Sequence, residues 1–212
     1  GISLQRGDRI EEKMPNIDVV ATSFLEAVSN NCRWVLKTKR KFYSDTPILL
    51  EIEAQGNMHA LELVLDIGDM SDFEIVTVIK GKADWLGLLR TGKIGKGSNI
   101  CDVTVGIQEK GVLLRLDCIS LGRDANMNTG TVSSGSEKTK ADLRYRMAES
   151  GSNLQVLGSI LSRDEMHLDY HIEIQHDAPE TFSRLVWNAA CGGNSRTIGT
   201  GMLKVAKGST GT

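Results

Sequence analysis

The chain has 212 residues, a formal net charge of −2 and only 5 % aromatic side chains. This length suits one domain with a sizeable core, and the near-neutral charge provides no overall field that would attract nucleic acid or an anionic membrane. No apolar run reaches the ~20 residues that a membrane helix requires, so we expect neither a nucleic-acid-binding nor a membrane protein.

Residues 1–15 are charged and aperiodic, which predicts a frayed lead-in. An amphipathic helix is expected after Pro15, with Asn16 as its N-cap and its end at Asn30. Its apolar residues recur at helical spacing and form one continuous stripe: Ile17, Val20, Ala21, Phe24, Leu25 and Val28.

A basic cluster follows this helix, and it has no interleaved aromatic residues beyond Trp34, Phe42 and Tyr43 and no recognised RNA motif. We interpret it as a solvated edge. Its members are Arg33, Lys37, Lys39, Arg40 and Lys41. We therefore divide the chain into a lead-in and helix over residues 1–45 and a β-rich core over residues 46–212.

From Thr46 onward, short segments alternate apolar and polar residues, which predicts strands. Clusters of Gly, Asn, Asp and Ser separate most of them, as expected for turns. The spacing is typical of sandwiches, barrels and solenoids, and the alternation alone leaves an antiparallel sandwich and a parallel β-helix both open. The predicted strands cover residues 48–54, 61–67, 73–79, 101–107, 112–119, 141–147, 154–161, 166–175, 182–190 and 198–206.

The strand predicted over residues 166–175 has one polar face that includes His167, Asp169 and His171. Alternate residues of a strand point the same way at about 7 Å spacing, so two of these side chains could share a divalent ion with a ligand from a neighbouring strand. A solvated polar face is the simpler interpretation, and a metal site is the alternative. Met166, Leu168, Tyr170, Ile172 and Ile174 are expected to face the core.

The next segment reads His176-Asp177-Ala178-Pro179-Glu180-Thr181-Phe182-Ser183, and a glycine-studded strand over residues 199–205 comes later. This order resembles the core of the SufB/SufD family of iron–sulfur cluster assembly scaffolds, in which a His-x-Ala-Pro-x-x-x-Ser segment precedes a glycine-containing loop and a strand. The resemblance covers the C-terminal third of the chain. The matching signature residues are His176, Ala178, Pro179, Thr181 and Ser183.

The resemblance implies a right-handed parallel β-helix, here with an N-terminal helix, and an antiparallel β-sandwich is the alternative. It also implies a cytoplasmic scaffold rather than an enzyme, in a homo- or hetero-oligomer with SufB-, SufD- or SufC-like subunits, the last being an ABC-type ATPase. A transiently bound iron–sulfur cluster or divalent metal is implied as cargo. In that family the cluster-holding cysteine and histidine follow the matched segment, so we expect a core fragment or a compact relative.

Four cysteines lie far apart with no C-x-x-C pair, which favours a reduced, intracellular protein. Cys191 stands beside two glycines and is a candidate metal or cluster ligand together with His167, Asp169 and His171. Cys101 and Cys118 are expected in the core. The alternation places His176 on the core side, where it would position the following loop rather than ligate a metal.

Two further functions stay open at this level. One is a metal-delivery chaperone of similar β-rich build, and the other is a β-helical carbohydrate-processing enzyme with paired carboxylates. The scarcity of aromatic side chains argues against the enzyme.

Overall fold

The computed structural model describes residues 1–7 and 32–212, and the described residues form strands and turns without any helix. The helix predicted over residues 16–30 lies outside the described residues. Sheet A has eight strands, in the order β1 (Ile2–Arg6), β2 (Arg33–Thr38), β4 (Met58–Ile67), β6 (Trp85–Ile94), β8 (Val112–Leu121), β10 (Lys138–Met147), β12 (His167–His176) and β14 (Arg196–Val205). Sheet B has six strands, β3 (Ile48–Ala54), β5 (Asp72–Gly81), β7 (Asn99–Gly106), β9 (Asn126–Ser133), β11 (Asn153–Ser162) and β13 (Phe182–Cys191).

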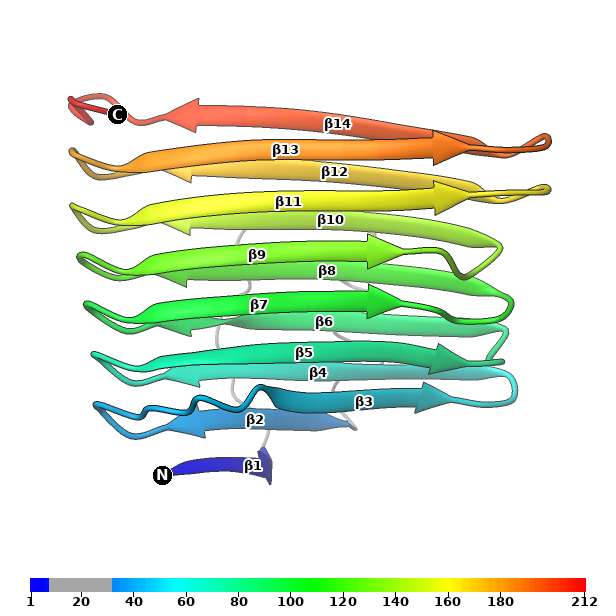
Figure 1. Cartoon of the computed structure of the whole chain (residues 1–212), viewed down its shortest axis with the longest axis horizontal. Coiled ribbons are helices and arrows are strands. Elements are labelled where there is room, and N and C mark those ends of the chain that lie inside the picture. Colours follow the sequence, from blue (N-terminus) through cyan, green and yellow to red (C-terminus); the bar gives the residue numbers. More distant parts are fainter. Residues whose placement is uncertain (8–31) are drawn as a thin grey trace.

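From β2 onward, consecutive strands alternate between the two sheets, and each strand pairs in parallel with the strand two places earlier. The chain is therefore a parallel β-solenoid of about six turns (Figure 1). Among the described strands, only β1 and β2 pair antiparallel. The prediction of a parallel β-helix is confirmed, and the alternative of an antiparallel sandwich is wrong.

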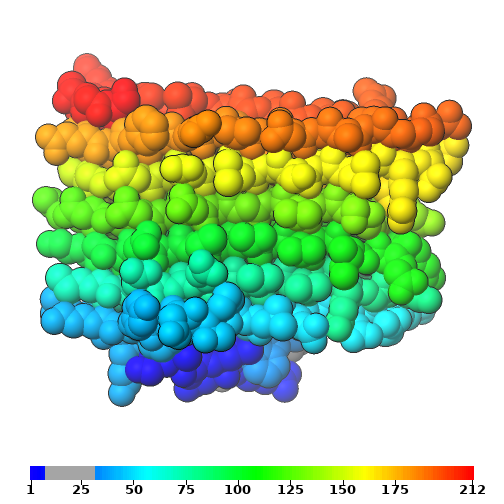
Figure 2. Space-filling model, viewed as in Figure 1, coloured from blue at the N-terminus to red at the C-terminus, as the bar shows by residue number. Residues whose placement is uncertain are grey.

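Each turn of the solenoid forms one layer, and the layers follow the order of the sequence (Figure 2). Inward side chains stack in columns because the parallel register repeats from turn to turn. In sheet A one such column contains Ile67, Ile94, Leu121 and Met147, and all four are buried. These columns place apolar side chains from both sheets in the lumen, and their burial is the main stabilising contribution to the fold.

The chain forms four strands that the alternation did not predict. Residues 2–6 are strand β1 rather than a frayed lead-in, and part of the basic cluster lies in β2, so strand structure begins before residue 46. Strand β6 escaped notice because both its faces carry leucine and its inward face carries Arg90. Strand β9 was hidden because the inward Thr129 and Thr131 make both its faces polar.

The last described turn explains the glycine-studded strand. Trp187 of β13 points into the lumen, where its ring lies 5.2 Å from that of Tyr170. A Cβ atom on Gly158, its paired neighbour in β11, would lie 2.3 Å from the Trp187 ring, so no larger residue fits there without rearrangement. Gly199 faces the same ring from sheet A at ordinary contact distance. The glycines therefore make room for one large aromatic side chain.

Within the described residues, no helix is long and apolar enough to cross a membrane.

Candidate functional site

The signature residues meet at the corner between β12 and β13. His176 is only 3 % exposed, and its ring joins two hydroxyl groups that follow it in sequence. Its Nδ1 atom lies 2.7 Å from Thr181 Oγ1, and its Nε2 atom lies 2.9 Å from Ser183 Oγ. Ala178 completes the corner, since Thr181 donates its hydroxyl hydrogen to the Ala178 carbonyl at 3.2 Å. Pro179, at the tip of the corner, is exposed.

This hydrogen-bond pattern matches a neutral histidine. Because the Thr181 hydroxyl donates to Ala178, it accepts from His176, which places the imidazole proton on Nδ1. Nε2 is then free to accept from Ser183. Burial lowers the pKa of His176, which agrees with an uncharged ring. The structure thus brings His176, Thr181 and Ser183 together, and both ring nitrogens of His176 already have hydrogen-bond partners.

The polar face of β12 points outward, as its alternation predicted. The carboxylate of Asp169 accepts from Lys140 at 2.6 Å, and that of Glu173 accepts from Lys204 at 2.8 Å. His167 is exposed and His171 is half-buried on the same face. Within the described residues, no three His, Cys, Asp or Glu side chains stand close enough to hold a metal ion, so His167, Asp169, His171 and Cys191 are not brought together.

Cys191 ends β13 and is exposed. Side-chain hydrogen bonds with Ser162 and Thr197 lower the pKa of its thiol. Thr197 donates its hydroxyl hydrogen to Ser162 at 2.8 Å, so the two hydroxyls form one cluster beside the sulfur. An exposed thiol with a lowered pKa has more thiolate at neutral pH and is therefore the more reactive kind of cysteine.

The prediction that Cys101 and Cys118 lie in the core is wrong. Their neighbours Asp102 and Asp117 occupy the inward positions, and this places both thiols on outer faces, Cys101 on sheet B and Cys118 on sheet A. The cause is that charged residues replace apolar ones on the inward sides of β7 and β8. Burial raises the pKa of Cys118 to about 12.

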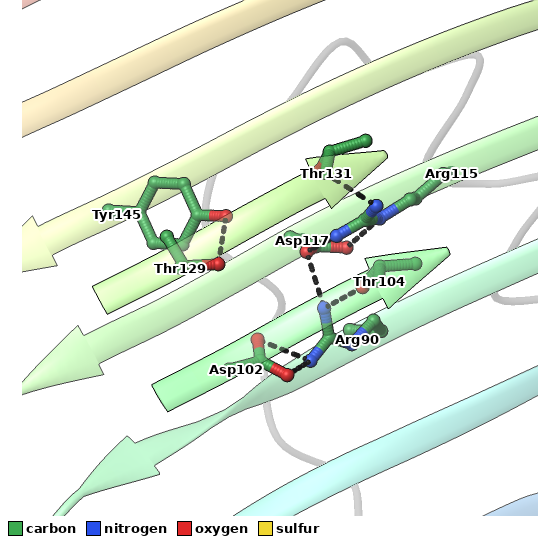
Figure 3. A network of polar contacts seen from close by, with 8 residues as sticks. All are labelled: Arg90, Asp102, Thr104, Arg115, Asp117, Thr129, Thr131 and Tyr145. Atoms are coloured by element: carbon green, nitrogen blue, oxygen red, sulfur yellow. Dashed lines mark hydrogen bonds and ion pairs between the residues drawn. The ribbon is translucent and has the colours of Figure 1, made fainter. Parts of the chain in front are cut away.

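These charged residues belong to a polar network inside the lumen that the sequence interpretation missed (Figure 3). Arg90 of β6 donates to both carboxylate oxygens of Asp102 in β7, at 2.8 and 2.7 Å. It also donates to Asp117 of β8 at 3.1 Å and to Thr104 at 3.0 Å. The network therefore crosses from sheet A to sheet B.

A second arginine extends the network by one turn. Arg115 donates to both oxygens of Asp117, at 2.9 and 2.6 Å, and to Thr131 at 3.2 Å. Thr129 and Tyr145 lie beside it with their hydroxyls 3.4 Å apart. The two arginines balance the two carboxylates, and the side chains of all three ion pairs are 2 % exposed or less.

Two opposing effects set the pKa values in the network: burial favours the neutral forms, and the oppositely charged partners favour the charged forms. Burial alone would raise the pKa of Asp117, but Arg115 and Arg90 outweigh it and hold that pKa below its usual range. Burial likewise disfavours the charged form of Arg90, and Asp102 and Asp117 reverse this, so its pKa is raised. Arg90, Arg115 and Asp117 are therefore charged at neutral pH. The sequence does carry one signal of this network. Arg90 and Asp117 stand at positions where the alternation of their strands requires inward side chains.

The geometry defines a parallel β-solenoid with a charged network in its lumen. The sequence matches the family described as SUF system FeS cluster assembly, SufBD core domain, over residues 52–212. The chain therefore belongs to the SufBD family, a generally non-catalytic scaffold family with a role in SUF iron–sulfur cluster assembly. Among individual curated proteins, none matches the chain.

Proposed function

We propose that the protein is a scaffold component of iron–sulfur cluster assembly that acts in a complex with SufB-, SufD- or SufC-like subunits. The observation that carries this proposal is the family match over residues 52–212, which spans every turn from β4 to β14. A solenoid suits this role because its stacked sheets offer long, continuous surfaces to several partners at once.

The partner assignment is tested by co-expression of the chain with candidate subunits. The tagged chain is expected to co-purify with an ABC-type ATPase subunit in a defined ratio, and to restore cluster delivery in cells that lack their own scaffold subunit. Retention of neither a SufB-, SufD- nor SufC-like subunit under native conditions would contradict the proposal.

Cys191 is the residue that we propose as a transient ligand of iron or of the nascent cluster. Thiolate sulfur is the usual protein ligand of iron in such clusters, and Cys191 combines exposure with a lowered pKa. The outward residues His167, Asp169 and His171 are a weaker proposal for a divalent ion, because a lysine already pairs with the Asp169 carboxylate.

Anaerobic reconstitution with ferrous iron and sulfide separates these ligands. A Cys191→Ser variant is expected to bind less iron and sulfide than the wild type, whereas the Cys118→Ser variant serves as a matched control and binds as much. A His167→Ala/His171→Ala double variant examines the outer face in the same assay. Equal binding by Cys191→Ser and wild type would remove Cys191 from the proposal.

We further propose a right-handed coil and a reducing, cytoplasmic location. Crossovers between parallel strands of one sheet are right-handed in nearly all proteins, which supports the first. All four cysteines are free thiols, which supports the second.

A further inference from the structure

The outer face of sheet B carries a continuous apolar stripe. Strands β5 to β13 of this sheet turn alternate side chains outward, and the parallel register aligns these side chains in rows that cross the strands. One row is apolar throughout apart from Gly130, and the next row adds three valines. We define the sheet B stripe by the apolar members of these two rows: Val76, Val78, Val103, Val105, Val132, Leu157 and Val186.

The sheet B stripe is open to solvent. Val132 is 43 % exposed and Leu157 is 44 % exposed, although both lie on strands in the interior of the sheet. Sheet B lies at the front of Figure 2, and no other described segment lies over it. Contiguous apolar patches on a protein surface mark interaction sites, so we expect a protein surface to cover the stripe.

Two opposite charges flank the stripe at equal distances from its centre. Glu74 in β5 and Arg184 in β13 belong to the row beside the stripe, and each lies two strands from β9. In the part of the chain that the structure describes, neither side chain forms a hydrogen bond or an ion pair. The other charged side chains on the outer faces of β5 to β13 are Asp72 and Lys80, and both have partners within the chain. The complete row is Glu74, Cys101, Asn128, Gln155 and Arg184.

We propose that two copies of the chain pack sheet B against sheet B, with a twofold axis that runs along β9. Such an axis keeps each row on the same row of the second copy and reverses the order of the strands, so β5 of one copy lies on β13 of the other. Glu74 then faces Arg184 of the second copy, and symmetry forms the same pair a second time. Val132 in β9 lies beside the axis and meets its own counterpart.

The alternative twofold axis, perpendicular to the strands, fits this surface less well. It reverses the rows about the central row of the stripe, so Glu74 would face Val78 of the same strand in the second copy. A carboxylate would then lie on an apolar side chain without a partner, which costs free energy. The position of the charges therefore selects the axis along β9.

The area of this face suits a stable dimer. Strands β5, β11 and β13 each have ten residues, which corresponds to a length of about 33 Å. Five strands at a spacing of about 4.8 Å cover about 24 Å. The face therefore offers about 800 Å², the area that each partner contributes to an interface of standard size. Two flat sheets that pack with their strands aligned also form the usual arrangement of a β-sandwich.

Sedimentation of the full chain tests the proposal, and the wild type is expected to form a dimer at micromolar concentration. Glu74→Arg and Arg184→Glu each bring like charges together twice, so each is expected to raise the dissociation constant of the dimer at least about tenfold. The double variant Glu74→Arg/Arg184→Glu is expected to recover the wild-type constant, because it restores opposite charges across the axis. Thr200→Asp, at an exposed position on the outer face of sheet A, is the matched control and should leave the constant unchanged.

Cys101 provides a second measurement, because its thiol lies in the row between Glu74 and Arg184. Its alkylation is expected to slow as the protein concentration rises, while the rate at Cys118 on sheet A stays constant. A Val132→Asp variant places like charges beside the axis and should abolish both the dimer and the protection of Cys101, with an unchanged circular dichroism spectrum.

Three outcomes would overturn the proposal. A wild-type chain that stays monomeric would do so and would assign the stripe to a protein of different sequence. A dimer that both single charge variants leave unchanged would contradict the pairing, and so would a double variant that does not recover the wild-type constant. This inference does not depend on the proposed function.

Discussion

At the scale of single residues, the most unusual feature is the set of four charges enclosed in the lumen. Two arginines and two aspartates lie where a solenoid normally stacks apolar side chains, and their mutual hydrogen bonds compensate for lost hydration. Buried pairs of this kind contribute little when complete, but they are costly to break, because the remaining charge has no partner. The network therefore constrains which side chains can occupy the inward positions of β6, β7 and β8.

Removal of Asp102 should reveal this cost. An Asp102→Ala variant leaves the Arg90 guanidinium without its main partner, and the free energy of unfolding is expected to fall by about 3–5 kcal/mol. Urea denaturation followed by circular dichroism measures it. Asp66→Ala, which breaks the exposed pair with Lys37, is the matched control and should cost at most about 1 kcal/mol. Equal losses in the two variants would show that the lumen charges are not coupled.

His176 should make stability depend on pH. Burial lowers its pKa in the folded protein below the ordinary value of about 6.5, so the unfolded chain takes up a proton more readily. The stabilisation is complete above about pH 6.5 and is lost as the pH falls through the lowered pKa of the folded state. Unfolding free energies measured between pH 7 and 5 should decrease in the wild type and less in His176→Gln. The exposed His167→Gln variant should keep the wild-type slope.

The cysteines should differ widely in reactivity. Cys191 is expected to react with iodoacetamide at neutral pH faster than Cys118, because neighbouring hydroxyls lower the pKa of Cys191 and burial raises that of Cys118. Mass spectrometry of the alkylated peptides gives both rates in one sample. A Ser162→Ala variant should move the pH profile of Cys191 upward. Similar profiles for the two cysteines would contradict the assigned environments.

At the scale of the element, glycines in β11 and β14 leave space in the lumen for the large side chain of Trp187 in β13. Trp187 fills the last turn of the lumen because Gly158, its paired neighbour in β11, has no side chain. A Gly158→Ala substitution is expected to lower the melting temperature by several degrees, since the new methyl group would overlap the indole ring. Gly199→Ala is the control, because its Cβ would lie 3.5 Å from the same ring and needs little adjustment. Calorimetry that ranks the two variants alike would reject this account of the packing.

The strands differ in how well alternation predicts them, and the reason lies in what their inward faces carry. Strand β12 was predicted almost to its ends because Leu168, Tyr170 and Ile172 alternate with polar residues. Strands β6 and β9 were not, because leucine occupies both faces of the first and threonine replaces apolar residues on the inward face of the second. Local alternation reports a strand only when its two faces differ in polarity.

The candidate sites also differ in how well the sequence alone could predict them. The corner of His176, Thr181 and Ser183 is local in sequence, so its residues could be predicted from the chain alone. The lumen network joins residues from four strands of two sheets, and no sequence spacing reveals that Arg90 meets Asp102 and Asp117. Such contacts depend on the register between turns, which the strand pattern does not fix.

At the scale of the whole molecule, the chain is a parallel solenoid of the SufBD family, which has a role in SUF iron–sulfur cluster assembly. The division at residue 45 stays a prediction, although β1 and β2 already contribute strands to sheet A before it. Sheet A gains these two N-terminal strands and sheet B does not, so the two outer faces differ in extent. Partners that recognise one face are therefore not expected to recognise the other.

The repeating register has a consequence for how the molecule could change in length. Met58 pairs with Trp85, Trp85 with Val112, and Val112 with Lys138, so equivalent positions recur once in every turn. Insertion of one complete turn would preserve every column of the lumen, whereas a single extra residue inside a strand would exchange its two faces. Duplication or loss of whole turns is thus the mode of evolutionary growth that this architecture tolerates, and the corners are where shorter insertions can accumulate.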